Sequence, residues 1–145
     1  RTSPTSTRAQ GFALGAAQFA RTEGMLFSRG TVYFCCTSGG SARSGQVWRL
    51  DAARQRITLA VEPNDRALLD GPDNLTVAPN GDLLVCEDGR GENRIVGVTS
   101  GGRFYDFARN AFNERELCGA CFSPDRRTLF VNLYDPGVTF AIQDA

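Results

Sequence analysis

The sequence contains no histidine, and its 16 basic residues are balanced by 16 acidic ones. Without histidine, a zinc site of the usual cysteine and histidine type is not expected. A formal net charge of zero gives no overall field that would attract nucleic acid or anionic lipid. No apolar run reaches the roughly 18 to 20 residues that a membrane span requires. We therefore expect neither nucleic acid nor a membrane span, but a small neutral ligand or a locally charged site.

Patterns typical of long helices are also missing. The 145 residues, 41% hydrophobic and 22% charged, suffice to bury the core of one domain. Residues 1–10 predict a polar loop, and residues 11–20 are mostly apolar and only loosely similar to a signal peptide. We favour a short helix or strand there. Because the chain begins with Arg rather than Met, we expect its true N-terminus to be missing.

The five cysteines do not form paired metal-binding motifs. Cys35, Cys36 and Cys86 lie inside apolar strand patterns, where free cysteine commonly acts as a small buried hydrophobe. Cys118 and Cys121 have CxxC spacing, but they lie at the start of a strand pattern and lack the helix of a thioredoxin-type motif. We therefore expect no redox catalysis from them.

Internal repetition is the most informative feature of the sequence. Residues 23–40, 73–90 and 118–135 each have the pattern of a strand, a tight turn and a second strand. Two further strand patterns follow each of the first two copies, and one follows the third. Four short strands at a period of about 40 to 50 residues are typical of a β-propeller blade. The sequence predicts an all-β propeller, with an antiparallel sandwich as the alternative.

The predicted blades cover approximately residues 20–65, 66–112 and 113–145. Propellers have roughly four to eight blades, so about three blades cannot close a ring. An open array would expose strand edges. We therefore expect the chain to be the C-terminal part of a longer protein, with the rest of the propeller supplied by upstream sequence.

Alternation within the middle hairpin identifies its core residues. Leu75 and Val77 lie on one face of the first predicted strand, and Leu83 and Val85 lie on one face of the second. We predict that all four side chains are buried in the middle blade.

Acidic residues recur at the start of the innermost predicted strands. Glu23 is placed there in the first repeat, Asp73 and Asn74 in the second, and Glu116 in the third. Repeat equivalence should bring these side chains together near the axis of the ring. Neighbouring carboxylates repel one another and remain ionised only beside cations, so they predict a site for a hard metal ion.

The far end of the middle hairpin carries Glu87 and Asp88, which an antiparallel turn returns to the level of Asp73. We include both as candidate metal ligands. Asp88, Glu92 and Asn93 surround two glycines, and their oxygens are suitable ligands for calcium. A solvated polar hairpin loop is an equal alternative for this segment.

Three arginines accompany the acidic residues. Arg21, Arg90 and Arg115 each lie within three residues of a candidate ligand. Guanidinium groups bind phosphate oxygens in a bidentate fork, although each arginine could instead pair with the carboxylates. Together they predict an anionic substrate, with Arg90 and Arg115 as the candidate catalytic arginines.

These stretches resemble a known family. "RTEGM", "GPDNLTVAPNGDLLVCEDG" and "CGACFSPDRRTLFVNLYDPGVTFAI" are similar to the C-terminal half of the PhoX alkaline phosphatases, over roughly residues 20–143. The resemblance implies a six-bladed propeller that holds iron and calcium and hydrolyses phosphate monoesters. It also implies a small phosphorylated substrate and a periplasmic or secreted location, reached by the twin-arginine route.

The resemblance assigns metal binding to Glu23, Glu116 and Asp73 by their places in the family's motifs. The sequence departs from the family pattern with "TEG" for "PEG", "PDRR" for "PDGR" and "VCEDG" for a "QTDG" type of strand end. The family also uses a cysteine and acidic residues from an upstream segment. We therefore expect an incomplete site, inactive when this chain is alone.

Two other functions fit the same fold. The hairpin at residues 72–89 is also similar to those of gluconolactonase-like propellers, in which one divalent ion bound by Glu, Asn and Asp serves lactone hydrolysis, and Asn74 would then be a direct ligand. A non-catalytic propeller that binds a partner protein is the third candidate. We favour the phosphatase because its similarity extends through residues 116–143.

Overall fold

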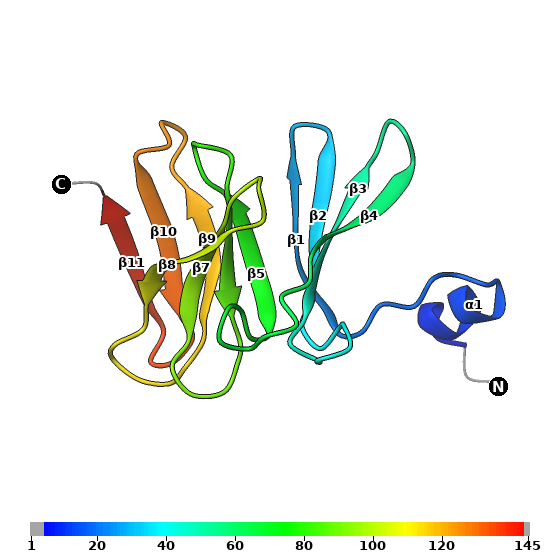
Figure 1. Ribbon diagram of the computed structural model, residues 1–145, viewed down its shortest axis with the longest axis horizontal. Coiled ribbons are helices and arrows are strands. Elements are labelled where there is room, and N and C mark those ends of the chain that lie inside the picture. Colours follow the sequence, from blue (N-terminus) through cyan, green and yellow to red (C-terminus); the bar gives the residue numbers. More distant parts are fainter. Residues whose placement is uncertain (1–4, 144–145) are drawn as a thin grey trace.

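The computed structural model describes residues 5–143, which form one short helix and 11 strands (Figure 1). Helix α1 spans Thr7–Ala13. The strands are β1 (Thr22–Ser28), β2 (Thr31–Cys36), β3 (Gln46–Asp51), β4 (Arg56–Val61), β5 (Pro72–Val77), β6 (Leu83–Glu87), β7 (Arg94–Val98), β8 (Phe104–Arg109), β9 (Leu117–Phe122), β10 (Thr128–Leu133) and β11 (Val138–Gln143).

The strands form three antiparallel sheets in which neighbours along the chain are neighbours in space. The sheets are β1–β4, β5–β8 and β9–β11. They lie side by side, with β5–β8 in the middle and α1 and β11 on opposite sides (Figure 1). The prediction of an all-β fold is confirmed. Within residues 5–143 the sheets do not close a ring or barrel.

Turn chemistry explains where the hairpins bend. Between β5 and β6, the Ala78 N–H donates to the Asp82 carbonyl at 2.9 Å, and the Gly81 N–H donates to the Ala78 carbonyl at 2.9 Å. Gly81 has a φ of +96°, which glycine adopts without steric cost. The Asn80 side chain accepts from the Asp82 N–H at 3.1 Å. These residues are the turn formers of "PNGD".

The core consists of two apolar clusters, one on each face of the middle sheet. One cluster joins it to β1–β4, and the other joins it to β9–β11. Leu75, Leu83 and Val85 are buried as predicted, while Val77 is only partly buried and packs against the same cluster. All five residues of β6 are buried, because this strand has a sheet on each side.

Cysteine burial also follows the prediction. Cys35 belongs to the first cluster and Cys86 to the second, and Cys36 is fully buried as well. These thiols fill small apolar spaces between and within the sheets.

The first strand of each sheet lies next to the first strand of the neighbouring sheet. Strand β5 contacts β1 on one side and β9 on the other. Each of these three strands also has a bulge or irregularity in its pairing with the next strand. A bulge adds a residue to one strand and re-aims its side chain, and in β1 and β5 it lies at the start of the strand, where it can present polar groups.

The N-terminal segment differs from its prediction, because α1 makes residues 7–10 helical where a polar loop was expected. Residues 1–4 of that segment lie outside the described residues. The Ser6 hydroxyl caps the helix by accepting from the Ala9 N–H at 3.3 Å. No helix among residues 5–143 is both long and apolar enough to span a membrane.

Candidate metal centre

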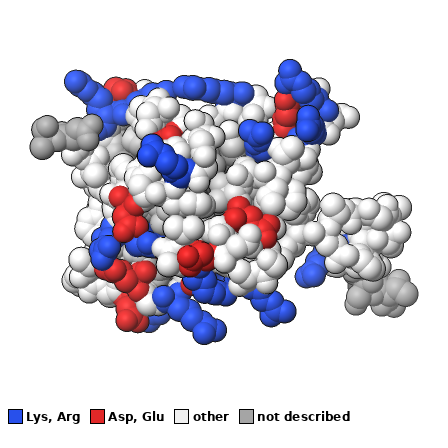
Figure 2. Space-filling view, in the orientation of Figure 1, with Lys and Arg blue, Asp and Glu red and all other residues white. Residues whose placement is uncertain are grey.

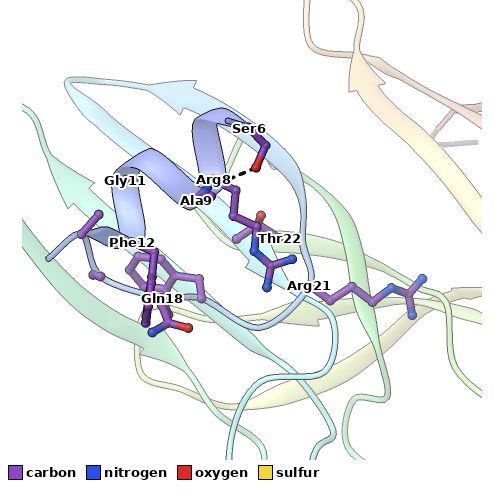
Figure 3. Close-up of a pocket in the computed structure, with 11 residues that line it drawn as sticks. Ser6, Arg8, Ala9, Gly11, Phe12, Gln18, Arg21 and Thr22 are labelled. Carbon is purple, nitrogen blue, oxygen red and sulfur yellow. Dashed lines mark hydrogen bonds between the residues drawn. The ribbon is translucent and has the colours of Figure 1, made fainter. Parts of the chain in front are cut away.

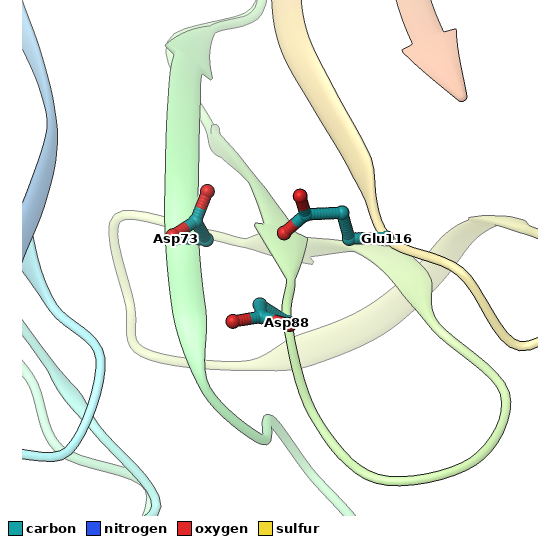
Figure 4. A group of neighbouring side chains, drawn as sticks. All are labelled: Asp73, Asp88 and Glu116. Atoms are coloured by element: carbon teal, nitrogen blue, oxygen red, sulfur yellow. The ribbon is translucent and has the colours of Figure 1, made fainter. Parts of the chain in front are cut away.

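Three carboxylates from different elements converge beside the first strands of two sheets. Asp73 lies in β5, Asp88 follows the end of β6, and Glu116 directly precedes β9. One oxygen of each side chain lies within 4.8 Å of the others. The three side chains point toward a common space (Figure 4). The arrangement can surround one cation with oxygen ligands.

The bulge in β5 determines where Asp73 points. Pro72 pairs with Glu87 and Asn74 pairs with Cys86, so Asp73 is the extra residue of its strand. Gly24 of β1 packs against this bulge. A Cβ at Gly24 would lie 2.5 Å from the Asp73 carbonyl oxygen and 3.1 Å from Asn74 Nδ2. Only glycine therefore permits this approach of β1 to β5, and Asn74 faces β1 at this contact.

Backbone contacts with Gly71 fix the position of Asp88. Its N–H donates to the Gly71 carbonyl at 2.8 Å, and a Cβ at Gly71 would lie 2.6 Å from the Asp88 carbonyl oxygen. Gly71 also has a φ of +63°, a second reason for glycine at this position. The next N–H, that of Gly89, donates to Asn93 Oδ1 at 2.8 Å.

Asn93 connects this loop to the segment that carries Glu116. Its Nδ2 donates to the Glu114 carbonyl at 2.9 Å, and the residue is buried. Sequence analysis proposed Asn93 and Glu92 for a calcium loop with Asp88. In the structure, the Asn93 side chain is hydrogen-bonded to backbone groups, and Glu92 Oε2 lies 3.2 Å from Arg109 Nη1. Only Asp88 of that set is brought to the cluster.

The electrostatics of the cluster favour a bound cation. Burial raises the pKa of Asp73, and the charges of Glu23 and Asp88 raise it further. Burial also raises the pKa of Glu116, with added effects from Asp88 and Asp73. The carboxylates thus disfavour one another's charged form, a cost that a metal ion removes.

Arg21 supplies positive charge at the rim of the cluster. Its Nη2 donates to Asp88 Oδ2 at 2.7 Å, and its Nε lies 3.5 Å from Glu23 Oε1. The hydrogen bond to Asp88 is the main cause that raises the pKa of Arg21. Half of the Arg21 side chain stays exposed. Glu23 is near enough to influence Asp73 and Glu116 but is not one of the three closest carboxylates.

Glu87 is not brought to the cluster. Its carboxylate accepts from Arg94 Nε at 2.9 Å, Arg94 Nη2 at 2.8 Å and the Asp70 N–H at 2.9 Å. Successive strand residues point to opposite sides, so the chain that directs Asp88 toward the cluster directs Glu87 away from it. The structure therefore gives Glu87 a buried ion pair, where sequence analysis predicted a metal ligand.

Arg90 and Arg115, the two arginines predicted to be catalytic, do not form ion pairs with the acidic cluster either. Arg115 Nε lies 3.6 Å from Asp135 Oδ2, and both side chains are exposed. Arg90 is exposed, and its backbone N–H donates to Asp70 Oδ2 at 3.4 Å. Of the three arginines considered from the sequence, Arg21 is the one that contacts the acidic cluster.

Cys118 is a neighbour of the cluster that sequence analysis did not include. Burial raises its pKa, and the charges of Glu116 and Asp73 raise it further. The deeper Cys86 has its pKa raised to about 12, mainly by burial. Both thiols therefore stay protonated at neutral pH. The position of Cys118 in β9, two residues after Glu116, is the signal that could have identified it.

An open cavity lies between α1 and the start of β1 (Figure 3). Its volume is about 800 Å³, and its lining includes Ser6, Phe12, Phe19, Arg21 and Thr22. Arg21 lines this cavity and also contacts Asp88, so it connects the cavity to the carboxylates. On the face shown in Figure 2, basic and acidic side chains are interspersed, which makes the acidic cluster a local feature.

Comparison with known proteins gives one family. The model of the family described as alkaline phosphatase PhoX matches residues 1–137. A search of curated proteins finds no match to the chain.

Proposed function

The chain belongs to the alkaline phosphatase PhoX family, and we propose that it serves metal-dependent hydrolysis of phosphate monoesters. The observation that supports this activity most strongly is the convergence of Asp73, Asp88 and Glu116 within 4.8 Å. Family membership implies a phosphatase that depends on metal and acts on a phosphate ester. We assign metal binding to these three residues and to Glu23, at the edge of the same cluster.

The donor set fits hard cations. All three side chains offer carboxylate oxygens, and the sequence has no histidine. Such ligands suit calcium or ferric iron better than zinc, and calcium and iron are the metals we propose. When bound, these ions supply the positive charge that polarises a phosphoryl group. Asp73 and Glu116 are partly shielded from water, which strengthens their attraction for a cation.

Arg21 is the residue we assign to the phosphate group of the substrate. A guanidinium binds two phosphate oxygens in a fork and stabilises the charge that develops during phosphoryl transfer. Half of the Arg21 side chain is exposed, the residue lines the cavity, and its guanidinium contacts Asp88 and Glu23. The exposed Arg90 and Arg115 remain predicted contributors to substrate attraction.

We further propose that the three sheets are blades of a six-bladed propeller, with β1, β5 and β9 along its channel. The contacts of β5 with β1 and β9 support this arrangement, because innermost strands of adjacent blades lie side by side. The family also supports a periplasmic or secreted location.

Hydrolysis of 4-nitrophenyl phosphate by the full-length protein, with and without calcium and iron, tests the proposed activity. Glu116→Gln keeps the size of the side chain but removes its charge, so we expect activity to fall at least ~10 to 100-fold. We expect Glu23→Gln to lower the phosphatase activity as well. Glu114→Gln is the matched control, since Glu114 is exposed and engages Asn93 through its carbonyl only.

A lactone substrate is assayed in parallel. Turnover of the lactone without phosphate release would contradict the proposal and favour the gluconolactonase-like alternative. Full phosphatase activity in Glu116→Gln would contradict the assignment of Glu116.

A further inference from the structure

A polar hollow lies on the β1–β4 sheet, at the end far from the candidate metal centre. Its volume is about 340 Å³, and it is lined by Thr31, Arg49, Asp51, Arg54, Arg56 and Thr58. We call it the arginine hollow. Thr31 pairs with Ser28 at the last residue of β1, whereas Glu23 lies near the first. At about 3.3 Å per strand residue, roughly 20 Å separates the two ends of β1. The arginine hollow is therefore distinct from the carboxylate cluster.

The arginine hollow opens on the face of β1–β4 that is directed toward the middle sheet. Arg49 pairs with Tyr33 and with Thr58, and Tyr33 packs against the apolar cluster between these two sheets. Paired residues share a face of a sheet, as do residues two apart in a strand. The β3–β4 hairpin leans away from the middle sheet (Figure 1). Both sheets that border this space thus belong to the described chain.

The internal repeat shows that the middle sheet fills the equivalent position. Gly97 pairs with Tyr105 there, as Arg49 pairs with Thr58 in the first sheet. The Tyr105 ring lies directly on Gly97, since a Cβ at Gly97 would collide with it. The Tyr105 hydroxyl donates to Asp82 Oδ2 at 3.0 Å. In the first sheet an arginine and a threonine replace this closed aromatic contact, and the space between their neighbours is left open.

Two of the three guanidinium groups are oriented by neighbouring side chains. Arg49 Nε donates to Thr58 Oγ1 at 2.8 Å. Arg54 Nη1 donates to Asp51 Oδ2 at 2.7 Å, and the Arg54 N–H donates to Asp51 Oδ1 at 2.9 Å. Side chains that are already ordered lose less conformational entropy when a ligand binds. These contacts therefore prepare the arginine hollow for a ligand.

The lining also keeps hydrogen-bond donors for a ligand. Within residues 5–143, the two Nη atoms of Arg49 and the guanidinium of Arg56 form no hydrogen bond or ion pair. The hydroxyls of Thr31 and Thr58 can each donate as well. Three guanidiniums and one carboxylate give the lining a formal charge of +2. Figure 2 shows basic side chains around an acidic one at this end of the sheet. Such a set of donors fits an oxyanion.

We propose that the arginine hollow is a second anion site, which binds the phosphate group of a small molecule without hydrolysing it. The planar fork of a guanidinium matches two phosphate oxygens, and threonine hydroxyls can bind the others. A volume of about 340 Å³ is at the low end of the roughly 300 to 1,000 Å³ of small-ligand sites. The zero net charge of the chain gives no field that would attract a polymeric nucleic acid. The ligand is therefore free phosphate or a small phosphate ester.

Isothermal titration calorimetry of inorganic phosphate into the chelator-treated full-length protein tests the site. Chelation removes the metal that would attract phosphate to the carboxylate cluster. We expect saturable binding by the wild type and by Glu116→Gln. Arg49→Gln and Arg56→Gln should each weaken it at least ~10-fold, since each removes charged donors. Arg103→Gln is the matched control, because Arg103 is exposed in the β7–β8 turn, the counterpart of the β3–β4 turn. Circular dichroism confirms that each variant is folded.

Phenylphosphonate, whose carbon–phosphorus bond a phosphatase does not hydrolyse, distinguishes the two ligand sources. Affinity equal to that of phosphate would identify free phosphate as sufficient, and tighter binding would identify an ester. Either result supports the site if Arg49→Gln weakens it.

Three results would overturn the proposal. The first is that the wild type binds neither compound. The second is that both arginine variants keep the wild-type affinity. The third is that a single-stranded oligonucleotide binds more tightly than both compounds and depends on the same arginines, since this would identify a polymer as the ligand. Because these titrations need no metal and no turnover, failure of the proposed phosphatase activity would not alter them.

Discussion

Asp73 shows how a single residue connects the fold to the proposed chemistry. Burial and two neighbouring carboxylates raise its pKa, and Arg21 only partly offsets them. A carboxyl with a raised pKa in the folded state favours folding while it is protonated. That contribution is lost as the pH rises through the raised pKa. At neutral pH without metal, Asp73 therefore destabilises the fold that positions it.

We predict that Asp73→Asn is more stable than the wild type at pH 7 in the presence of a chelator. The advantage should shrink as the pH falls and should vanish below the ordinary Asp pKa of about 3.9, where both states are protonated. Thermal unfolding between pH 3 and pH 8 measures this difference in stability.

Asp125→Asn is a control for which we expect the opposite change in stability. Hydrogen bonds from Ser123 and from the Arg127 N–H lower the pKa of Asp125, so its charged form favours folding at neutral pH. Asp125→Asn should therefore be less stable than the wild type at pH 7, and the loss should disappear at low pH. An Asp73→Asn variant that is less stable throughout would contradict the electrostatic account.

At the scale of elements, the buried Glu87–Arg94 pair joins several segments around Asp88. Besides its bonds to Glu87, Arg94 donates through Nη1 to the Ala67 carbonyl at 3.2 Å and to Asp106 Oδ1 at 2.9 Å. The pair thus connects the end of β6, the start of β7, strand β8 and the β4–β5 loop. The Glu87 side chain is only 2% exposed, so its charge depends on this partner.

We expect replacement of Arg94 alone to lower the stability of the fold more than replacement of both Glu87 and Arg94. Arg94→Met leaves a buried charge without a partner, and we expect a cost of about 3 to 5 kcal/mol. The double variant Glu87→Leu with Arg94→Met should recover part of that loss. Arg109→Met, which removes exposed pairs with Glu92 and Asp106, should cost less than about 1 kcal/mol.

Urea unfolding of these variants gives the comparison. If the double variant lost as much stability as the sum of its single substitutions, the two side chains would not act as a pair.

The hairpins could be predicted from sequence because their turns carry strong local signals. "PNGD" bends the β5–β6 hairpin through Asn80 and Gly81, and the flanking alternation identified Leu75, Leu83 and Val85. A short helix or strand was expected within residues 11–20, whereas α1 spans Thr7–Ala13, and its start could not be predicted because it buries no residue and leaves no apolar periodicity in the sequence. Its signal was limited to the capping hydroxyl of Ser6.

The acidic cluster was predictable in part. Repeat equivalence placed Asp73 and Glu116 together, since it depends only on where each repeat begins. It could not separate Glu87 from Asp88, because the direction of each side chain depends on strand register and on the bulge at Asp73. Contact of Arg21 with Asp88 joins two different sheets and leaves no local signal in the sequence.

At the scale of the whole molecule, zero net charge coexists with a concentrated acidic site. Charges elsewhere on the surface shown in Figure 2 are interspersed. The contacts of β5 with β1 and β9 place the carboxylates where neighbouring sheets meet. We therefore propose that Asp73, Asp88 and Glu116 together bind a hard cation.

Isothermal titration calorimetry, in which calcium is titrated into chelator-treated protein, tests whether these three residues bind a cation. We predict saturable binding in the wild type and in Glu114→Gln, and an affinity at least ~10-fold weaker in Asp73→Asn and Asp88→Asn, since each removes one charged ligand. Wild-type affinity in both aspartate variants, or no calcium binding by the wild type, would contradict the claim.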